Sequence, residues 1–524
     1  MKRKYSIALL SDSSVRWDII IIGGGATGLG TAVDAASRGY KVALLEQSDF
    51  TKSTSSRSTK LVHGGVRYLA QGNIRLVTEA LHERGRMRDN APHLVKDQRF
   101  IIGNYRWWEK TFYTLGLTLY DLLAAQHAFG RSLPVSRKQV TAEIPQIRIK
   151  GLKGGVVYHD GQFDDSRMAI NLAQTAAELG AACTNYVRVT GLTKNEYGKI
   201  TGVNALDMLA NRSFCLQARV VINATGIFVD ELMQMDVRKK VGIVRPSQGV
   251  HLVVDKSFLG GDTAIMIPGT SDGRVLFGVP WHGKAILGTT DTPVNEFVLE
   301  PKALDEEIDF ILRTAGAYLL KQPRREDVLS VFAGLRPLAA PAKNSGDRKT
   351  KEISRSHKIM VSKSGLLTVT GGKWTTYRRM AEDTVNRAIT IAGLPYRKCT
   401  TGHLHIHGYK KAVNRTSFSH VYGSDYEKIL LLQRENGGWN EKLHPKYDYT
   451  GKEVVWAVRE EMAFTVEDVL ARRLRLLFLD ARAAIEVAPK VAALMAGELG
   501  EDAAWERAQV DLFTETAKGY CLNL

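Results

Sequence analysis

The chain has 524 residues, of which 44% are hydrophobic and 24% are charged. This composition is that of a folded globular protein, it excludes a disordered one, and the length favours two or three domains. The 72 Lys and Arg residues outnumber the 55 Asp and Glu residues and give a formal net charge of +17, which predicts attraction to nucleic acid, an anionic membrane surface or a phosphorylated substrate.

The N-terminus and the cysteines exclude several further classes. The apolar run Ile7–Leu10 is shorter than the roughly 7–15 residues of a secretory signal, and no uncharged stretch reaches the ~18 residues of a membrane span. We expect a cytosolic protein, or one that lies on a membrane without crossing it. No haem, iron–sulfur, calcium or zinc pattern is present, so we expect no metal and a reducing compartment. The cysteines are widely spaced: Cys183, Cys215, Cys399 and Cys521.

The segment "RWDIIIIGGGATGLGTAVDAASRGYKVALLEQ" predicts a strand, a tight turn, a helix and a second strand. The apolar run Ile19–Ile22 is typical of a buried parallel strand. Gly23, Gly25 and Gly28 match the G-x-G-x-x-G pattern, which lets a backbone turn approach a pyrophosphate. Glu46 follows the second strand, where an acid accepts ribose hydroxyls. A bare turn is the alternative, but the complete pattern favours a dinucleotide site for FAD or NAD.

Two later segments favour FAD over NAD. Residues 218–232 form another buried strand that ends in a turn. Residues 364–393 predict a strand, a glycine turn and a helix that Thr375 or Thr376 caps and Gly393 ends. An extended FAD needs such a helix end beside its ring system, because the partial positive charge there stabilises the anionic reduced flavin. A third α/β unit without ligand contact is the alternative.

The remaining segments differ in pattern. Residues 240–335 contain short alternating stretches separated by turns, which predict an antiparallel sheet. After Pro395 the chain is charged, rich in alanine and leucine, and helical in period. We therefore expect three domains: a discontinuous FAD-binding domain of residues 15–95, 165–240 and 330–395, a substrate (cap) domain of residues 96–164 and 241–329, and a C-terminal helical domain of residues 396–524.

Five motifs, in this order along nearly the whole chain, resemble FAD-dependent, aerobic-type glycerol-3-phosphate dehydrogenases. They are "IIGGGATGLGTAVDAASRG", "TSSRSTKLVHGGVRYL", "AGLRPL", "GGKWTTYRRMA" and "EMAFTVEDVLARRLRLLFLD". The resemblance implies an α/β fold: a glutathione-reductase-like FAD-binding Rossmann-type domain, an inserted antiparallel-sheet substrate domain and a C-terminal all-helical domain. It also implies oxidation of sn-glycerol 3-phosphate to dihydroxyacetone phosphate, with hydride transfer to N5 of FAD and electrons passed to a membrane quinone.

The resemblance also assigns roles to residues. Arg67, Tyr68, Arg336 and Lys373 bind the substrate, since a phosphate dianion is held by Arg and Lys. His63, Arg336 and Lys373 are the expected catalytic residues, with neutral His63 accepting the proton of the C2 hydroxyl; a histidine that packs on the flavin is the alternative. Cofactor contacts are expected from the glycine turns and the segment around His63: Gly23, Gly24, Gly25, Thr27, Gly28, Glu46, Ser55, Ser56, Thr59, Lys60, His63, Gly64, Gly65, Ala224, Thr225, Gly226, Gly371, Gly372, Lys373, Trp374 and Thr375.

Three other stretches are open to more than one interpretation. His357 is a weaker candidate for the pocket rim, because the family carries a similar Ser-Arg-x-His stretch. The arginine-rich run 343–358 is interpreted as a mobile loop, with a solvated face or a phosphate-attracting rim as the alternatives. The "HLHIH" stretch at 403–407 alternates like a metal-binding strand, but no carboxylate or cysteine accompanies it, so we interpret it as exposed chain.

Membrane contact is expected because a quinone acceptor lies in the bilayer. Residues 105–130 combine aromatic and basic side chains that suit a headgroup interface; an ordinary core helix is the alternative. We expect a peripheral protein on the inner face of the cytoplasmic membrane, with no nucleic-acid partner, and leave a homodimer open. The family's oxidases carry an insertion and its mitochondrial members carry C-terminal calcium loops; neither is recognisable here, which favours a bacterial-type dehydrogenase over an oxidase that uses O2.

Other functions compete with this interpretation. An oxidoreductase of the same fold could act on another small hydroxy or amino compound. A flavin-bearing regulatory protein would show no turnover, and an NAD-dependent dehydrogenase would leave the helix after residue 373 without a role.

Overall fold

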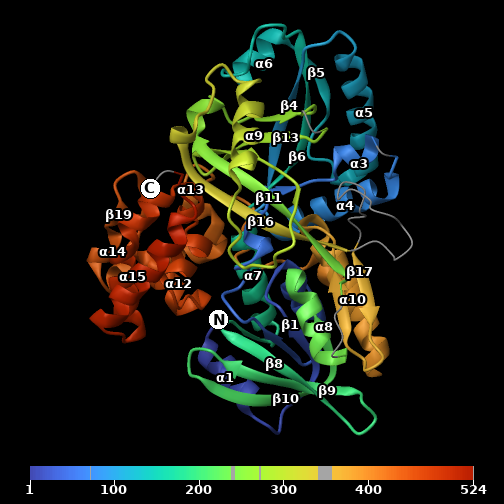
Figure 1. Cartoon of the computed structure of the whole chain (residues 1–524), viewed down its shortest axis with the longest axis vertical. Coiled ribbons are helices and arrows are strands. Elements are labelled where there is room, and N and C mark those ends of the chain that lie inside the picture. The colour runs from blue at the N-terminus through green and yellow to red at the C-terminus, as the bar shows by residue number, and fades with distance from the viewer. Residues whose placement is uncertain (71, 238–241, 271–272, 340–356, 523–524) are drawn as a thin grey trace.

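The structure, a computed structural model, is shown in Figure 1. The expected loop at 343–358 lies almost entirely outside the described residues. The structure describes residues 1–70, 72–237, 242–270, 273–339 and 357–522, without the side chains of Arg67 and Ala70.

The first sheet is built on the buried isoleucine run. Five strands in the order β18-β10-β1-β2-β7 run parallel, and antiparallel β17, β8 and β9 extend the sheet. Ile19 and Ile21 pack against helices on one face, whereas Ile20 and Ile22 belong to the core on the other. Burial on both faces explains why the run is continuously apolar. The strands are β1 (Arg16–Ile22), β2 (Val42–Leu45), β7 (Ala182–Thr184), β8 (Val187–Lys194), β9 (Ile200–Asp207), β10 (Arg212–Asn223), β17 (Lys358–Val361) and β18 (Leu367–Thr370).

Helices cover both faces of this sheet. One face carries three helices, α2 (Ala26–Ser37), α7 (Asp165–Glu178) and α10 (Tyr377–Ala392), which share one apolar core with the strands. The other face contacts α1 (Arg3–Ser11), and α8 (Val229–Val237) follows β10. Helix α10 ends at Gly393, which is left-handed with φ 58°, as the sequence predicts.

The second sheet has ten strands among the described residues and lies at the other end of the molecule (Figure 1). Its pairs are antiparallel except for β4 with β12. Strand β16 pairs with β11 along its whole length, so it belongs to this sheet, although the expected boundary at residue 330 assigned most of it to the FAD-binding domain. The strands are β3 (Leu61–Val62), β4 (Lys96–Asn104), β5 (Leu133–Ser136), β6 (Gly154–Gln162), β11 (Val244–Asp255), β12 (Ala264–Ile267), β13 (Leu276–Trp281), β14 (Lys284–Gly288), β15 (Thr292–Pro293) and β16 (Val328–Ala339).

Helices also flank this second sheet on both faces. Phe100 of β4 shares a core with α5 (Glu109–Ala124), whereas the next residue, Ile101, shares a core with α6 (Arg137–Glu143) and α9 (Asp305–Gly316). This alternation follows from the period of two in a strand. Helices α3 (Val66–Ala70) and α4 (Ile74–Asn90) lie beside α5 near the junction of the two sheets (Figure 1).

The C-terminal part forms a helical domain at the side of the molecule (Figure 1). From Tyr426 on it is helical as expected apart from one hairpin, whereas residues 396–425 form irregular chain, turns and short 3₁₀ helices. The core of this domain includes Phe332 and Trp281 of the second sheet. The α/β fold class expected from the sequence is thus confirmed. The elements are α11 (Tyr426–Leu431), β19 (Lys442–His444), β20 (Tyr447–Thr450), α12 (Gly451–Glu461), a π-helix (Asp468–Arg473), α13 (Leu476–Leu479), α14 (Ala481–Leu499) and α15 (Ala503–Lys518).

Candidate functional site

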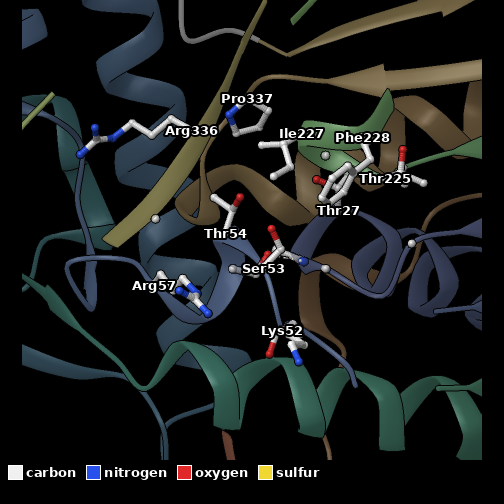
Figure 2. A pocket seen from close by; sticks show the side chains of 18 of the residues that line it. Thr27, Lys52, Ser53, Thr54, Arg57, Thr225, Ile227, Phe228, Arg336 and Pro337 are labelled. Atoms are coloured by element: carbon white, nitrogen blue, oxygen red, sulfur yellow. Dashed lines mark hydrogen bonds between the residues drawn. The ribbon is translucent and has the colours of Figure 1, made fainter. Parts of the chain in front are cut away.

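A cavity of about 360 Å³ lies where the carboxyl ends of the parallel strands meet the second sheet. Ligands bind at this edge in open α/β sheets. The turns after β1, β2, β10 and β18 line it from one side, and β11 and β16 line it from the other. Figure 2 shows Thr225, Ile227 and Phe228 near Thr27, with Arg336 farther along the cavity.

The glycine turn after β1 fits a dinucleotide. Gly23 has φ 110°, and a Cβ on Gly28 would collide with the carbonyl oxygen of Gly23, so strand and helix can approach this closely only with glycine. Gly23, Gly25 and Thr27 line the cavity, whereas Gly24 and Gly28 shape the turn without lining it. The N-terminus of α2 therefore faces the cavity, where it favours a phosphate.

Glu46 lies in the lining at the end of β2, where the sequence places it. Its Oε2 accepts a hydrogen bond from the N–H of Gly24 at 2.6 Å, and its Oε1 accepts one from Ser48 at 2.9 Å. Burial raises the pKa of Glu46, against the lowering effect of these two bonds. The carboxylate is thus fixed beside the turn, at the position expected for a ribose contact.

The loop between β2 and β3 contributes the largest continuous part of the lining. Ser55 Oγ accepts the N–H of Ala26 at 3.0 Å and so satisfies one donor at the start of α2. Thr54 Oγ1 donates to the carbonyl of Leu335 at 2.6 Å, and Trp374 Nε1 donates to the carbonyl of Ser55 at 2.8 Å. We call residues 49–60 the cofactor loop; its cavity-lining members are Thr51, Lys52, Ser53, Thr54, Ser55, Arg57, Ser58 and Thr59.

The other side of the cofactor loop is held by buried ion pairs. Asp49 lies between two arginines: its Oδ2 is 2.5 Å from Nε of Arg472 and 2.7 Å from Nη1 of Arg473. Lys60 Nζ and Arg475 NH2 both contact Asp165, at 2.6 Å and 2.9 Å, and all three side chains are fully buried. Three arginines of the C-terminal domain therefore reach the cofactor loop.

Lys60 and Ser56 consequently differ from the expectation that they contact the cofactor. Neither lines the cavity. Lys60 adopts a left-handed backbone with φ 62°, and its ammonium group also donates to the carbonyl of Ser56 at 2.6 Å. Burial lowers the pKa of Lys60 to about 7, against the raising effect of Asp165. These two residues hold the loop from behind.

The turn after β18 brings its expected residues into the cavity: Gly371, Gly372, Lys373, Trp374 and Thr375 all line it. The helix start differs from the expectation, because a 3₁₀ turn precedes α10 and no threonine side chain accepts a helix N–H there. Thr376 Oγ1 donates to the carbonyl of Lys373 at 3.3 Å, and Thr375 Oγ1 accepts the N–H of His63 at 3.2 Å. Thr375 thus links the turn to His63.

A second cavity of about 180 Å³ adjoins the first, and His63, Thr59 and Arg336 line both. Tyr68 and Gly65 also line it, and Lys373 Nζ lies 4.1 Å above the Tyr68 ring. The structure therefore brings four expected site residues together: His63, Tyr68, Arg336 and Lys373. The side chain of Arg67 lies outside the described residues, and Gly64 is buried behind the lining.

Arg336 is aimed by the strand that carries it. Its NH1 contacts the carbonyl of Gln248 and Asp291 Oδ1, both at 3.3 Å, and its NH2 contacts Thr289 Oγ1 at 3.1 Å. A Cβ on Gly249 would collide with the guanidinium group, so the glycine makes room for it. The guanidinium group is therefore held at the junction of the two cavities.

The sequence also missed lining residues, including several of the cofactor loop and, outside it, Arg274 and His251. Arg274 lines the second cavity. His251 lines the first; it stacks on Phe332 with ring centroids 4.9 Å apart, and its Nε2 lies 2.9 Å from Thr59 Oγ1. Burial lowers the pKa of His251 well below its usual value and so favours the neutral ring. His251 was missed because it lies on β11, whose apolar pattern indicates a core strand.

Two weaker expectations are not supported. His357 lines neither cavity, and its Nε2 lies 3.1 Å from Asp383 on α10. His407 of the "HLHIH" stretch is half-buried between Glu178 and Asp425 rather than exposed. Within the described ranges, no three His, Cys, Asp or Glu side chains are grouped to hold a metal ion, and no described helix is long and apolar enough to cross a membrane.

Comparisons with known proteins agree with this geometry. Residues 18–378 match a family described as FAD dependent oxidoreductase, and residues 366–508 match one described as the C-terminal domain of alpha-glycerophosphate oxidase. The mitochondrial glycerol-3-phosphate dehydrogenase of Rattus norvegicus is 39% identical to this chain, and the match covers 98% of this chain and 74% of the relative. The mitochondrial glycerol-3-phosphate dehydrogenase of Schizosaccharomyces pombe is 36% identical, and the match covers 96% of this chain and 87% of the relative. A crystal structure of glycerol-3-phosphate dehydrogenase from Bacillus halodurans complexed with FAD has a TM-score of 0.79 and 28% sequence identity. The match covers 99% of this chain and 97% of that chain.

Proposed function

The chain belongs to the FAD-dependent glycerol-3-phosphate dehydrogenases, and from that premise we propose that it oxidises sn-glycerol 3-phosphate to dihydroxyacetone phosphate and passes the electrons to a membrane quinone. FAD is its cofactor. The observation that carries the proposal is the meeting of Arg336, Lys373, Tyr68 and His63 where the two cavities join. Cations from distant segments, gathered on one small cavity, fit a phosphorylated substrate.

The phosphate is assigned to the cationic part of the second cavity. Arg336, at the junction of the two cavities, offers a planar pair of donors, and Arg274 adds a second guanidinium group. Lys373 contributes a compact charge from the adjoining first cavity. Tyr68 adds a hydroxyl donor beside Lys373. These residues bind and orient the substrate so that its C2 carbon points toward the first cavity.

The C2 hydroxyl proton is assigned to His63, which lines both cavities. A neutral imidazole accepts a proton at physiological pH. Lys373 stabilises the negative charge that develops on the C2 oxygen. When bound, FAD supplies the two-electron acceptor for the C2 hydride.

An anaerobic titration of the purified holoenzyme tests this function. We expect glycerol 3-phosphate, but neither glycerol nor glycine, to bleach the flavin absorbance. His63→Asn should retain FAD but slow the bleaching by about 10²–10⁴-fold, the usual contribution of a general base. No bleaching by glycerol 3-phosphate would refute the function, and unchanged bleaching in the variant would return His63 to a packing role. Reoxidation by O2 with release of hydrogen peroxide, faster than by a soluble quinone, would favour an oxidase.

Membrane contact is assigned to the outer face of α5, at the end of the molecule that carries the second sheet (Figure 1). The exposed apolar side chains on this face and the basic excess of the chain support this assignment, and an ordinary core helix is the alternative. We assign the protein to the inner face of the cytoplasmic membrane. The exposed apolar side chains of this face and of the turn that precedes it are Trp107, Trp108, Phe112, Leu115, Leu119 and Leu122.

Leu122→Glu is expected to lower binding to vesicles of anionic phospholipid by about tenfold or more, because a buried leucine contributes roughly 1.5–3 kcal/mol. Co-sedimentation at low salt measures this binding, and high salt should release the wild type. Leu512→Glu on α15 is the matched control, since the two leucines are 71% and 65% exposed. Equal binding of both variants and the wild type would remove α5 from the membrane interface.

A further inference from the structure

The inner face of α5 carries a tyrosine, Tyr120, that forms a hydrogen bond with the peptide next to His63. Tyr120 is 1% exposed. Its hydroxyl accepts the N–H of Gly64 at 2.8 Å and donates to the carboxylate of Asp160, whose oxygens lie at 2.9 and 3.0 Å. A buried hydroxyl that uses both its donor and its acceptor is held in one orientation.

Asp160 connects this hydroxyl to the second cavity, which it lines. Asp160 is 3% exposed, and its carboxylate forms an ion pair with Arg84 Nη1 at 2.6 Å. Arg84 also donates to the carbonyl of His159 at 3.0 Å. Arg84 therefore balances the charge of Asp160, and the same carboxylate accepts the hydrogen bond that orients the tyrosine hydroxyl.

Gly64 directly follows His63, so its peptide sets the direction of the histidine. The N–H of His63 donates to Thr375 on one side, and the N–H of Gly64 donates to Tyr120 on the other. A Cβ on Gly64 would lie 2.7 Å from the Tyr120 hydroxyl, so the contact depends on glycine. Two successive peptide N–H groups are thus anchored to two different helical segments.

We propose that Tyr120, oriented by Asp160, is a positioning residue that fixes the Gly64 peptide and thereby aims the His63 imidazole at the substrate. This inference rests on the proposed function, because it assigns the aim of the expected proton acceptor. Tyr120 acts through the backbone and does not touch the substrate. Its loss should therefore slow the chemical step more than it weakens substrate binding, because a misplacement of about 1 Å can cost about 100-fold in rate.

The test compares Tyr120→Phe with Tyr113→Phe, which removes a hydroxyl from the same helix two turns earlier. Stopped-flow flavin reduction by glycerol 3-phosphate is measured over a range of substrate concentrations. We expect Tyr120→Phe to retain FAD and to lower the limiting reduction rate by about 10- to 100-fold with little change in the half-saturating concentration. Tyr113→Phe should match the wild type.

Each other outcome is decisive. Wild-type reduction kinetics in folded, FAD-loaded Tyr120→Phe would overturn the proposal, as would a higher half-saturating concentration at an unchanged limiting rate. If Tyr120→Phe does not fold, Asp160→Asn, which removes the charge that orients the hydroxyl, must show the same fall in limiting rate. If glycerol 3-phosphate does not reduce the wild type, the proposed function fails, which separates that failure from failure of the positioning role.

Discussion

Arg336→Ala is expected to lower kcat/KM for glycerol 3-phosphate by about a thousandfold, because two hydrogen bonds to a charged group contribute roughly 1.5–3 kcal/mol each. The guanidinium group is held at the junction of the cavities by Gln248, Thr289 and Asp291. This prior orientation lets it meet a phosphate without losing side-chain freedom. Steady-state kinetics with a soluble quinone acceptor measure the effect.

Two comparisons separate phosphate binding from a general loss of charge. Arg336→Lys keeps the charge but not the planar pair of donors, so it should recover only part of the loss. Arg325→Ala, which removes an arginine from an exposed pair with Asp305 and Asp309, should behave as the wild type. A kcat/KM for Arg336→Ala within tenfold of the wild type would remove Arg336 from the phosphate site.

Asp165→Asn is expected to destabilise the protein by about 3–5 kcal/mol, the usual effect of removing one partner from a buried ion pair. The substitution keeps the size of the side chain but leaves Lys60 and Arg475 without their shared carboxylate. Because Ser58 also donates to Asp165 at 2.7 Å, the cofactor loop should loosen and FAD should dissociate more readily. Urea unfolding and the FAD content after gel filtration measure the two effects.

The control for this substitution is Asp448→Asn, which breaks an exposed pair with Lys442. Exposed pairs contribute about 0–1 kcal/mol, so its unfolding curve should nearly overlay that of the wild type. If Asp165→Asn were as stable as Asp448→Asn and retained its FAD, the buried pairs would not support the cofactor loop.

Local patterns predicted much of the fold. The isoleucine run and its glycine turn gave β1 and α2, because a strand buried on both faces must be continuously apolar. Gly393 marked the end of α10 because few other residues adopt its left-handed backbone. The threonine cap was wrong because the 3₁₀ turn before α10 depends on how the chain enters from the glycine turn, which the sequence does not display.

The site was harder to predict where partners lie far apart along the chain. Lys60 stands in a motif rich in donors, but its left-handed backbone and its pairing with Asp165 direct it to the back of the loop. His251 enters the lining because β11 pairs with β16, which sets its ring against Phe332. Such contacts depend on the register of distant strands, which no local pattern fixes.

The buried arginines that hold Asp49 lie near the end of the chain and are therefore synthesised late. Arg472 contacts Asp49 across 423 positions of sequence. During synthesis, the glycines of the nucleotide turn therefore leave the ribosome long before the two arginines that pair with Asp49 exist. A nascent chain must keep the Asp49 carboxylate hydrated until these arginines emerge, so we expect a chain truncated before residue 472 to lose this support of the cofactor loop.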